Sequence, residues 1–377
     1  MDALTTPSNW QRVRLGDIGK PCMCKRVMKH QTTPYGEIPF YKIGTFGNTA
    51  DAFISKKLFL EYKTKYSFPK KGDILISASG TIGRAVIYDG KSAYFQDSNI
   101  VWIDNDETLV KNDFLFYAYS NIKWNTEHTT ILRLYNDNFR NTLIPLPPLN
   151  EQIAIANVLS DVDRYLCSLD ALILKKESVK KALSFELLSQ RKRLKGFNQT
   201  WQKVRLGDIC EIVKGQQINK ISLNNTDKYP VINGGIDFLG YTNNFNVSKN
   251  TIAISEGGTC GYVRFMTSDF WSGGHNYSLQ KISNKVNNLC LYHILKSYEK
   301  DIMKLGVGSG LKNIQLKALK DFEILLPPLN EQAAIANILS ALDSEIISLK
   351  NKKRQFENIK KALNHDLMSA KIRVLKK

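Results

Sequence analysis

A fifteen-residue segment that occurs twice constrains this chain more than any other feature. Residues 146–160 read LPPLNEQIAIANVLS, and residues 326–340 read LPPLNEQAAIANILS. Thirteen of the fifteen positions are identical, and the two exceptions exchange one apolar residue for another. The fixed offset of 180 residues indicates an internal duplication, which has to be recognised before any fold is assigned.

A second repeat frames the first. Residues 10–18 read WQRVRLGDI, and residues 201–209 read WQKVRLGDI. Each copy therefore runs from this motif through a variable block and an LPPLNEQ joint into a long helix. The blocks 19–145 and 210–325 differ almost completely, whereas the joints and helices are kept. We expect two copies of one architecture that have diverged in their blocks.

Composition and charge narrow the function classes. The chain has 377 residues, of which 43% are apolar, and a formal net charge of +18 with a pI near 9.5. The length fits two or three domains, and the charge favours a polyanionic partner such as nucleic acid. No apolar run approaches the ~18 residues of a membrane span, and the N-terminus shows no signal segment. The six cysteines lack a zinc-site spacing and suit a reducing compartment. We therefore expect a cytoplasmic protein without a membrane partner or metal site.

Each variable block has the pattern of a mixed α/β (α+β) domain. Short apolar runs are separated by Gly, Pro, Asn and Asp, as strands require, and one helical pattern follows them. In the first block the predicted strands are 38–44, 73–79, 84–90 and 99–104, and the helix is 113–122. The counterparts in the second block are 229–235, 250–265 and the helix 289–298.

The two blocks also share a glycine-rich turn between predicted strands. SASGTIG (77–83) and SEGGTCG (255–261) match at Ser, Gly, Thr and Gly, and each is followed by an arginine, Arg84 or Arg264. Glycine lets the backbone come close to a ligand or adopt a positive φ. We expect a ligand-facing edge here; ordinary hairpin turns are the alternative.

Each joint begins a long amphipathic helix. Two prolines hold the approach extended, and Asn150 followed by Glu151 suits a helix N-terminus. Apolar residues then recur at spacings of three and four, the seam of a coiled coil, over about 45 residues or ~70 Å. The seam positions are Leu159, Val162, Leu166, Leu169, Ile173, Leu183 and Leu187, and in the second helix Leu339, Leu342, Ile346, Leu349, Phe356, Leu363 and Leu367.

Such a stripe needs a partner, and the other helix can supply it. Lys180 and Lys360 hold the same seam position in the two copies. A parallel pair would set their ammonium groups opposite each other, whereas an antiparallel pair lets each stem pack while its head reaches water. We expect an antiparallel intramolecular pair with an approximate two-fold axis. Separate helical hairpins or an intermolecular coiled coil are the alternatives.

No catalytic motif is recognisable. The chain lacks GxxxxGK[ST] and HExxH, and GVGSG (306–310) follows a predicted helix where a dinucleotide fingerprint would follow a strand. Both Pro-Pro pairs lie in LPPL, not in the Asn/Asp-Pro-Pro-aromatic tetrapeptide of amino-methyltransferases. We expect a non-catalytic chain.

The doubled LPPLNEQ-x-AIAN joint, the WQ-x-VRLGDI motifs and the GTIG and GTCG turns make the chain resemble the specificity subunit of type I restriction-modification systems. The likeness covers essentially the whole chain. It implies two target recognition domains, 1–147 and 197–327, each reading one half of a split DNA sequence. Two antiparallel spacer helices, 148–196 and 328–377, would fix the gap between the halves.

The resemblance also implies the partners. Double-stranded DNA would be the ligand. Two methylation subunits would dock on the helices and joints and bring S-adenosylmethionine, and restriction (motor–nuclease) subunits would bring ATP and magnesium chemistry; this chain would hold no cofactor. The implied docking residues are Leu146, Pro147, Pro148, Glu151 and Gln152 in the first joint and Leu326, Pro327, Pro328, Glu331 and Gln332 in the second.

Bases are distinguished at groove edges by polar and Arg/Lys side chains. The candidate DNA contacts are therefore Lys42, Ser77, Ser79, Thr81 and Arg84 in the first block, and Gln216, Gln217, Asn233, Ser255, Thr259, Tyr262, Arg264 and Asn276 in the second. A stand-alone DNA-binding regulator or architectural protein is the alternative function. A nuclease ranks third because acidic metal-site motifs are missing.

Overall fold

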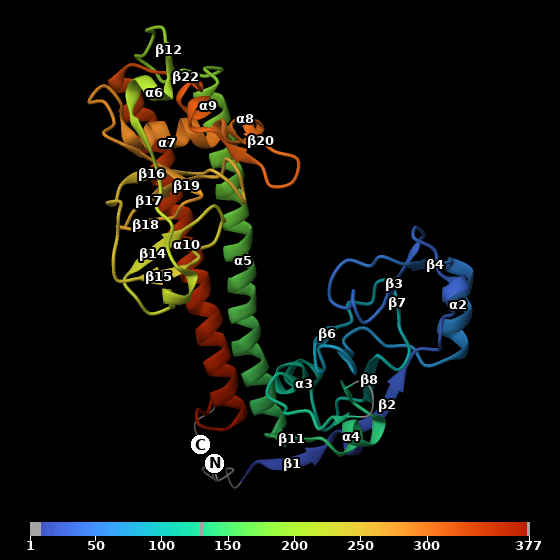
Figure 1. Ribbon diagram of the computed structural model, residues 1–377. Coiled ribbons are helices and arrows are strands. Elements are labelled where there is room, and N and C mark those ends of the chain that lie inside the picture. Colours follow the sequence, from blue (N-terminus) through green and yellow to red (C-terminus); the bar gives the residue numbers. More distant parts are fainter. Residues whose placement is uncertain (1–8, 129–131, 375–377) are drawn as a thin grey trace. The chain divides into compact units, whose positions relative to one another are not determined.

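The structure is a computed structural model that describes residues 9–128 and 132–374 (Figure 1). The chain forms two compact units, 1–169 with 352–377 (unit 1) and 170–351 (unit 2). Each unit joins one variable block to one half of each long helix. The first eight residues, which bear on the signal-segment prediction, lie outside the described residues. No described helix combines the length and the apolar character needed to cross a membrane.

Unit 1 contains two sheets and a two-stranded ribbon. The four-stranded antiparallel sheet has the order β2 (Gly19–Met23), β8 (Ile100–Asn105), β5 (Ile74–Ser77), β6 (Ala85–Ile87). The three-stranded sheet has the order β4 (Phe53–Ile54), β3 (Ile38–Tyr41), β7 (Tyr94–Phe95), with β3 and β7 parallel. The ribbon pairs β1 (Gln11–Arg14) with β11 (Leu143–Leu146). The other elements are α1 (Leu15–Ile18), η1 (Lys29–Gln31), α2 (Lys56–Lys65), α3 (Asn112–Tyr119), α4 (Asn136–Asn141) and the pair β9 (Glu127–His128) and β10 (Leu132–Arg133).

Unit 2 repeats this arrangement. Its four-stranded sheet has the order β13 (Glu211–Lys214), β19 (Asn276–Gln280), β16 (Thr251–Ser255), β17 (Val263–Met266). Its three-stranded sheet has the order β15 (Gly240–Thr242), β14 (Tyr229–Ile232), β18 (Trp271–Ser272), with β14 and β18 parallel. β12 (Gln202–Arg205) pairs with β22 (Glu323–Leu326). The remaining elements are α6 (Leu206–Ile209), η2 (Lys220–Ser222), α7 (Asn288–Ser297), α8 (Glu299–Lys304), α9 (Leu316–Lys320) and the hairpin of β20 (Gly306–Val307) and β21 (Asn313–Ile314).

The two blocks therefore share one topology although their sequences have diverged. The mixed α/β fold and the duplication predicted from the sequence are confirmed, and the predicted helices 113–122 and 289–298 correspond to α3 and α7. The short helices α1 and α6, inside the repeated WQ-x-VRLGDI motifs, were not predicted. Each four-residue helix is one turn long, too short for a periodic pattern to reveal it.

The long helices α5 (Leu149–Leu188) and α10 (Leu329–Met368) contain 40 residues each, fewer than the 45 predicted. Beyond each end lies a residue with positive φ, Gln190 (φ 60°) or Ala370 (φ 56°), at corresponding positions of the repeat. A left-handed residue at this place closes a helix C-terminus, and it is a feature of the backbone that side-chain periodicity does not signal.

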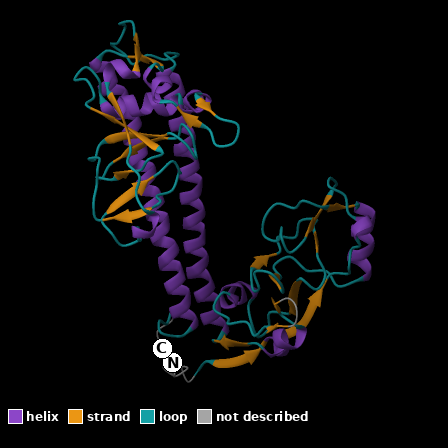
Figure 2. Cartoon of the chain, viewed as in Figure 1, coloured by secondary structure: helices purple, strands orange, loops and turns teal. Residues whose placement is uncertain are grey.

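The helices pair antiparallel within each unit (Figure 2). In unit 1 the early part of α5 meets the late part of α10, where Lys360 Nζ lies 2.5 Å from Asp163 Oδ1. In unit 2 the late part of α5 meets the early part of α10 through the corresponding ion pair of Lys180 with Asp343. Antiparallel pairing is confirmed. The lysine heads differ from the prediction, since each ends on a carboxylate of the opposite helix instead of in water.

Each helix start and end belongs to a domain core. In unit 1 Leu159 of α5 and Leu367 of α10 are buried with the apolar residues of the first block. In unit 2 Leu188 of α5 and Leu339 of α10 are buried with those of the second block. Because the helix ends share a core with their block, the block is held directly on the helix pair.

Candidate nucleic-acid interface and helix joints

In unit 2, three separate segments bring polar groups to one edge of the sheets. The Thr259 amide, in the turn between β16 and β17, donates to the Gly234 carbonyl after β14 over 2.8 Å. The Glu256 amide of the same turn donates to the carbonyl of His275, which precedes β19, over 2.9 Å. The His275 amide in turn donates to Asn233 Oδ1 over 2.9 Å. The candidate residues of this block are thereby gathered from distant parts of the sequence.

The close approach of two turns explains the glycines at this edge. Gly234 has a φ of +80°, and a Cβ there would lie 2.5 Å from the carbonyl oxygen of Gly257. Only glycine allows both that conformation and that distance. The shared Gly258 is likewise left-handed (φ +69°), and a Cβ there would lie 2.9 Å from the Gly234 carbonyl oxygen. Turn packing therefore requires glycine at these positions, and the packing also forms the polar edge.

A buried carboxylate that the sequence did not point out lies beneath this edge. Glu256 is 8% exposed, and its Oε1 lies 2.6 Å from Lys214 Nζ and accepts from the Tyr277 hydroxyl over 3.2 Å. Burial, and secondarily Glu256, raises the pKa of Tyr277 to about 12, so that this hydroxyl remains a donor at neutral pH. The available signal was a charged residue in SEGGTCG where the first block has Ala78.

The predicted DNA contacts of the second block fall into two groups. Ser255 and Asn276 are 3% and 1% exposed, and the Asn276 amide donates to Ser272 Oγ over 3.0 Å, so both support the strands. The remaining candidates are at least partly exposed: Gln216, Gln217, Asn233, Thr259, Tyr262 and Arg264. A base contact by any of them stays a prediction.

Arg264 holds the loop that follows β14. Its guanidinium donates to the carbonyls of Gly235 (3.4 Å) and Ile236, and it lies 5.1 Å from the ring centre of Phe238 and 5.4 Å from that of Tyr262. Arginine between aromatic faces is a favourable arrangement that fixes the side chain. Arg264 therefore orders this loop, whatever contact it makes with a ligand.

The first block builds a similar edge from different residues. Ser77 is 2% exposed, and its hydroxyl accepts from the Arg84 amide over 2.9 Å. Ser79 donates to Asn99 Oδ1 over 2.8 Å, and Arg84 donates to the Phe46 carbonyl over 3.0 Å. These four polar residues are thus already hydrogen-bonded within the block.

The two other candidates of the first block lie closer to solvent. Lys42 Nζ is 2.8 Å from Asp51 Oδ1 in an exposed pair, and Thr81 is exposed at the turn. An exposed pair of this kind exchanges readily because it contributes only about 0–1 kcal/mol. Both side chains are free to contact a ligand, which stays a prediction.

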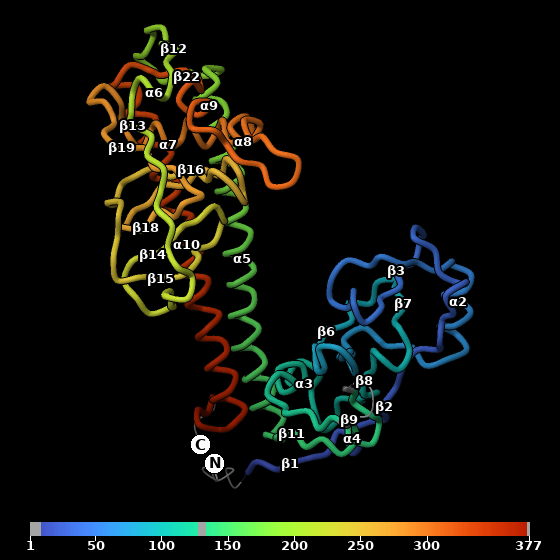
Figure 3. The backbone as a smooth tube through the Cα atoms, viewed as in Figure 1, coloured from blue at the N-terminus to red at the C-terminus, as the bar shows by residue number. Residues whose placement is uncertain are grey.

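The first joint contains a buried carboxylate held by three donors. Glu151 is 2% exposed; its Oε2 accepts from Trp10 Nε1 over 3.0 Å, and Arg373 Nε and Nη2 donate to its two oxygens over 2.5 and 2.7 Å. This contact joins the two ends of the described chain (Figure 3). We call the group of Trp10, Glu151 and Arg373 the first clasp.

The second joint repeats the same chemistry. Glu331 is 1% exposed, accepts from Trp201 Nε1 over 3.0 Å, and receives two bonds from Arg193 over 2.8 and 2.7 Å. We call the group of Trp201, Glu331 and Arg193 the second clasp. Arg193 belongs to the basic run 191–195 that follows the first helix. Its guanidinium neutralises a buried charge.

The glutamine of each joint clamps the block to the helix. Gln152 donates to the carbonyls of Pro147 (2.9 Å) and Leu109 (3.1 Å), and its Oε1 accepts from the Lys111 amide (2.9 Å). Gln332 makes the three corresponding bonds in unit 2. Bonds within each unit therefore account for the repeated Glu-Gln pair.

The structure places most predicted docking residues below the surface. Leu146, Pro147, Glu151, Gln152, Leu326, Pro327, Glu331 and Gln332 are buried, whereas Pro148 is exposed and Pro328 is half-buried. Exposed apolar neighbours of the joints were not predicted: Leu149, Ile153 and Leu329 are 40%, 46% and 46% exposed. Helical spacing places Leu149 and Ile153 on one face of α5, which was the available signal.

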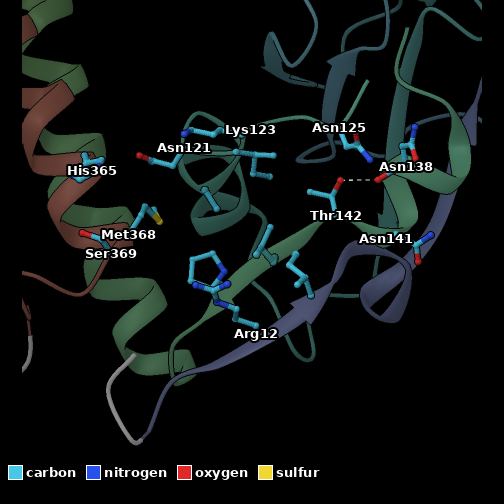
Figure 4. A pocket seen from close by; sticks show the side chains of 15 residues that line it. Arg12, Asn121, Lys123, Asn125, Asn138, Asn141, Thr142, His365, Met368 and Ser369 are labelled. Atoms are coloured by element: carbon cyan, nitrogen blue, oxygen red, sulfur yellow. Dashed lines mark hydrogen bonds between the residues drawn. The ribbon is translucent and has the colours of Figure 1, made fainter. Parts of the chain in front are cut away.

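Unit 1 also contains a cavity of about 500 Å³ beside the β1–β11 ribbon (Figure 4). Arg12, Lys123 and His365 line it, and Thr142 donates to the Asn138 carbonyl over 2.7 Å. Phe322 stands at the position that corresponds to Thr142 in the other repeat, where its ring packs 5.9 Å from that of Tyr298. Unit 1 thus has a small threonine that lines the cavity where unit 2 has an aromatic ring.

Within residues 9–128 and 132–374, no group of His, Cys, Asp and Glu is arranged to hold a metal ion. Burial raises the pKa of Cys24, Cys210 and Cys290 to about 12, so these thiols stay protonated and are poor nucleophiles.

Comparison with known sequences points to one family. Residues 7–176 and 198–358 each match the family described as type I restriction modification DNA specificity domain. A putative type I restriction enzyme specificity subunit of Haemophilus influenzae is 63% identical over 148 residues, which are 39% of this chain and 38% of that protein. A putative type I specificity subunit of Mycoplasma pneumoniae is 40% identical over 40% of each chain. The chain thus spans about two fifths of the length of these relatives.

Two further comparisons cover nearly the whole chain. A type I restriction enzyme specificity subunit of Methanocaldococcus jannaschii is 27% identical over 99% of this chain and 95% of its own length. The crystal structure of a type I restriction-modification S subunit from M. genitalium matches with a TM-score of 0.70 at 20% identity, covering 98% of this chain and 99% of that one. At that identity the structural likeness shows the fold alone.

Proposed function

Because this chain belongs to the type I restriction-modification specificity-subunit family, we propose that it is the subunit that selects the DNA sequence and itself carries out no catalysis. It recognises a bipartite target, with one half-site read by each variable block. The observation that carries the proposal is the duplicated fold: each unit joins a block of the same topology, with its own polar edge, to an antiparallel pairing of α5 with α10. Unlike edges suit an asymmetric target, and helices that run through both units suit a spacer between two half-sites.

The proposed domains follow the repeat. Residues 1–147 and 197–327 are the target recognition domains, and residues 148–196 and 328–377 are the spacer helices. The net charge of +18 supports attraction to the phosphate backbone, while the half-exposed polar groups of the edges supply base contacts. The complex acts in the cytoplasm, where double-stranded DNA is the ligand.

Two methylation subunits dock on the helices and joints in this proposal. The exposed apolar residues Leu149, Ile153 and Leu329 support such a surface better than the buried Glu151 and Glu331 do. The clasps would then act indirectly by holding the start of each helix in place. S-adenosylmethionine would be bound by the methylation subunits, and ATP and magnesium by restriction subunits.

A spacer-length experiment tests the proposal. Deleting 168–174 together with 348–354 removes one heptad from each helix at corresponding positions. The pair shortens by ~10 Å, or about 3 base pairs. Methylome sequencing of cells carrying this variant with its methylation subunit should show both half-sites unchanged and a shorter gap between them.

Two outcomes would overturn the proposal. An unchanged gap would deny the helices their spacer role. Failure of any methylation subunit to co-purify with the full chain, together with tight sequence-specific binding by the chain alone, would instead favour the stand-alone regulator. As a matched control, exchange of 19–145 for the block of another family member should change one half-site and leave the gap as it was.

A further inference from the structure

The β20–β21 hairpin of unit 2 carries an apolar side chain into solvent at the tip of a thin ribbon. Leu311 is 79% exposed, and the ribbon around it contains Gly306, Gly308 and Gly310, which have no side chains. Figure 1 shows this orange loop projecting from the labelled strand β20. Exposed single leucines are common on protein surfaces, but this one is set apart by its position next to the polar edge.

The base of the hairpin is fixed to the polar edge. Ile314 is 1% exposed; its amide donates to the Glu256 carbonyl over 2.9 Å, and its carbonyl accepts from the Tyr277 hydroxyl over 3.0 Å. A Cβ on Gly257 would lie 2.2 Å from Asn313 Oδ1, which shows how closely the hairpin covers the glycine-rich turn. The base of the hairpin therefore packs on the same turn that carries the candidate base contacts, and the tip with Leu311 is exposed beyond it.

A cation lies next to the leucine. Lys312 takes part in none of the ion pairs formed by residues 9–128 and 132–374, whereas Lys304 at the other end of the ribbon pairs with Asp301 over 2.7 Å. An unpaired lysine next to a DNA groove contacts phosphate. Apolar side chains on narrow ribbons are used by DNA-binding proteins to separate adjacent base pairs, with basic residues on the flanking backbone.

We propose that the β20–β21 hairpin inserts Leu311 between two base pairs of the half-site read by unit 2, while Lys312 contacts the adjacent phosphate. This inference rests on the proposed function and adds a deformation step to it. Separation of a base step depends on the sequence that is deformed, so the hairpin contributes specificity at positions that make no hydrogen bond to the protein. The step changes stacking only, and no covalent bond forms or breaks.

The test uses the full chain purified with its methylation subunit and duplexes that carry the target found in the methylome. 2-Aminopurine is placed in turn at each position of the half-site except the methylated base, because a methyltransferase can itself displace that base. We expect fluorescence to rise at one step with the wild-type complex and to remain low with Leu311→Ala. Leu311→Met, which keeps an apolar side chain, should restore the rise.

Affinity provides a second readout. Leu311→Ala removes the contact that the leucine would bury between the base pairs, and this should weaken binding to DNA about tenfold. Lys312→Gln should keep the fluorescence rise and lower the slope of log K against log[salt] by about 1. The matched control is Leu60→Ala, which removes a 52% exposed leucine from α2 of unit 1 and should alter neither readout.

Each contrary result is distinguishable. A fluorescence rise that persists in Leu311→Ala overturns the insertion. The insertion is also overturned if the wild-type complex shows no rise but loses affinity when thymine is replaced by uracil. In that case Leu311 would contact the thymine methyl group. A wild-type complex without sequence preference overturns the proposed function and the insertion with it.

Discussion

The two halves of the helix pair share one kind of contact and differ in another. Both units have a lysine–aspartate ion pair at corresponding positions, Lys360 with Asp163 in unit 1 and Lys180 with Asp343 in unit 2. Because the two pairs are related by the repeat, they would form equally well between two copies of the same helix. These contacts fix the antiparallel register without specifying the partner.

A neighbouring pair differs between the units. In unit 1 Tyr165 and Phe356 pack with ring centres 4.6 Å apart, whereas the corresponding residues of unit 2, Glu345 and Lys176, form an ion pair of 2.8 Å. Two α5 helices paired with each other would set Tyr165 against Lys176 and form neither contact. The difference teaches that duplication supplied the register, and later divergence made α5 and α10 complementary to each other.

The largest expected effect concerns the clasps, which are alike in the two units. Glu151→Ala and Glu331→Ala each leave a partly exposed arginine and a buried tryptophan N–H without their carboxylate acceptor, and we expect each to lower the free energy of unfolding by about 2–3 kcal/mol. Urea denaturation followed by tryptophan fluorescence measures both variants. A much smaller loss for Glu151→Ala than for Glu331→Ala would contradict the equivalence of the two clasps.

A smaller effect should depend on pH and arise in unit 2. His293 is buried, its Nε2 lies 3.1 Å from Ser340 Oγ, and burial lowers its pKa to about 4, while Asp343 raises it and Lys180 lowers it to a lesser degree. The folded protein thus favours neutral histidine. The contribution of neutral His293 to the free energy of unfolding is complete above the unfolded pKa near 6.5. It is lost as pH falls from there toward the folded pKa, and the loss is about 2 kcal/mol at pH 5.

Tyr117 occupies the corresponding place in α3 of unit 1, where it donates to Asp163 over 2.8 Å and does not titrate in this range. The change His293→Gln keeps a partner for Ser340 and removes the titration. Unfolding measured at pH 5 and pH 7.5 should therefore show a smaller pH dependence for the glutamine variant. Equal dependence in both proteins would assign the effect to other groups.

The smallest effect sharpens the contrast within the seam. Phe356→Ala removes an aromatic contact and should cost about 2 kcal/mol, whereas Lys176→Ala removes a partly exposed ion pair and should cost at most about 1 kcal/mol. Only the second loss should shrink between 0.05 and 1 M salt, because salt screens exposed charges. Thermal unfolding at both salt concentrations measures the two variants, and a salt-sensitive Phe356→Ala would contradict the assignment.

The sequence predicted the repeated features well. The strands around SASGTIG and SEGGTCG, the helices from Leu149 and Leu329, and their antiparallel pairing could be predicted because alternation, heptad spacing and repeat position are local or symmetric signals. The same signals failed at α1 and α6, which are single turns, and at the helix ends, where the backbone at Gln190 and Ala370 turns left-handed.

The site residues were harder to assign for a physical reason. The identity of a serine or asparagine near a turn does not reveal whether its side chain faces solvent or supports a strand. Ser255 and Asn276 proved to be buried. The repeated Glu151 and Glu331 likewise look like surface charges in the sequence. Their roles depend on which cations fold back onto them, and Arg193 and Arg373 do so from distant positions.

By itself, then, the sequence determined the duplication, the α/β blocks and the leucine seam, because each is repeated or periodic along the chain. Only the tertiary structure decided which polar residues remain at the edge, which carboxylates close the joints and where the hairpin with Leu311 emerges. These features depend on burial and on contacts between residues far apart in sequence, and neither burial nor long-range contact leaves a local pattern to read.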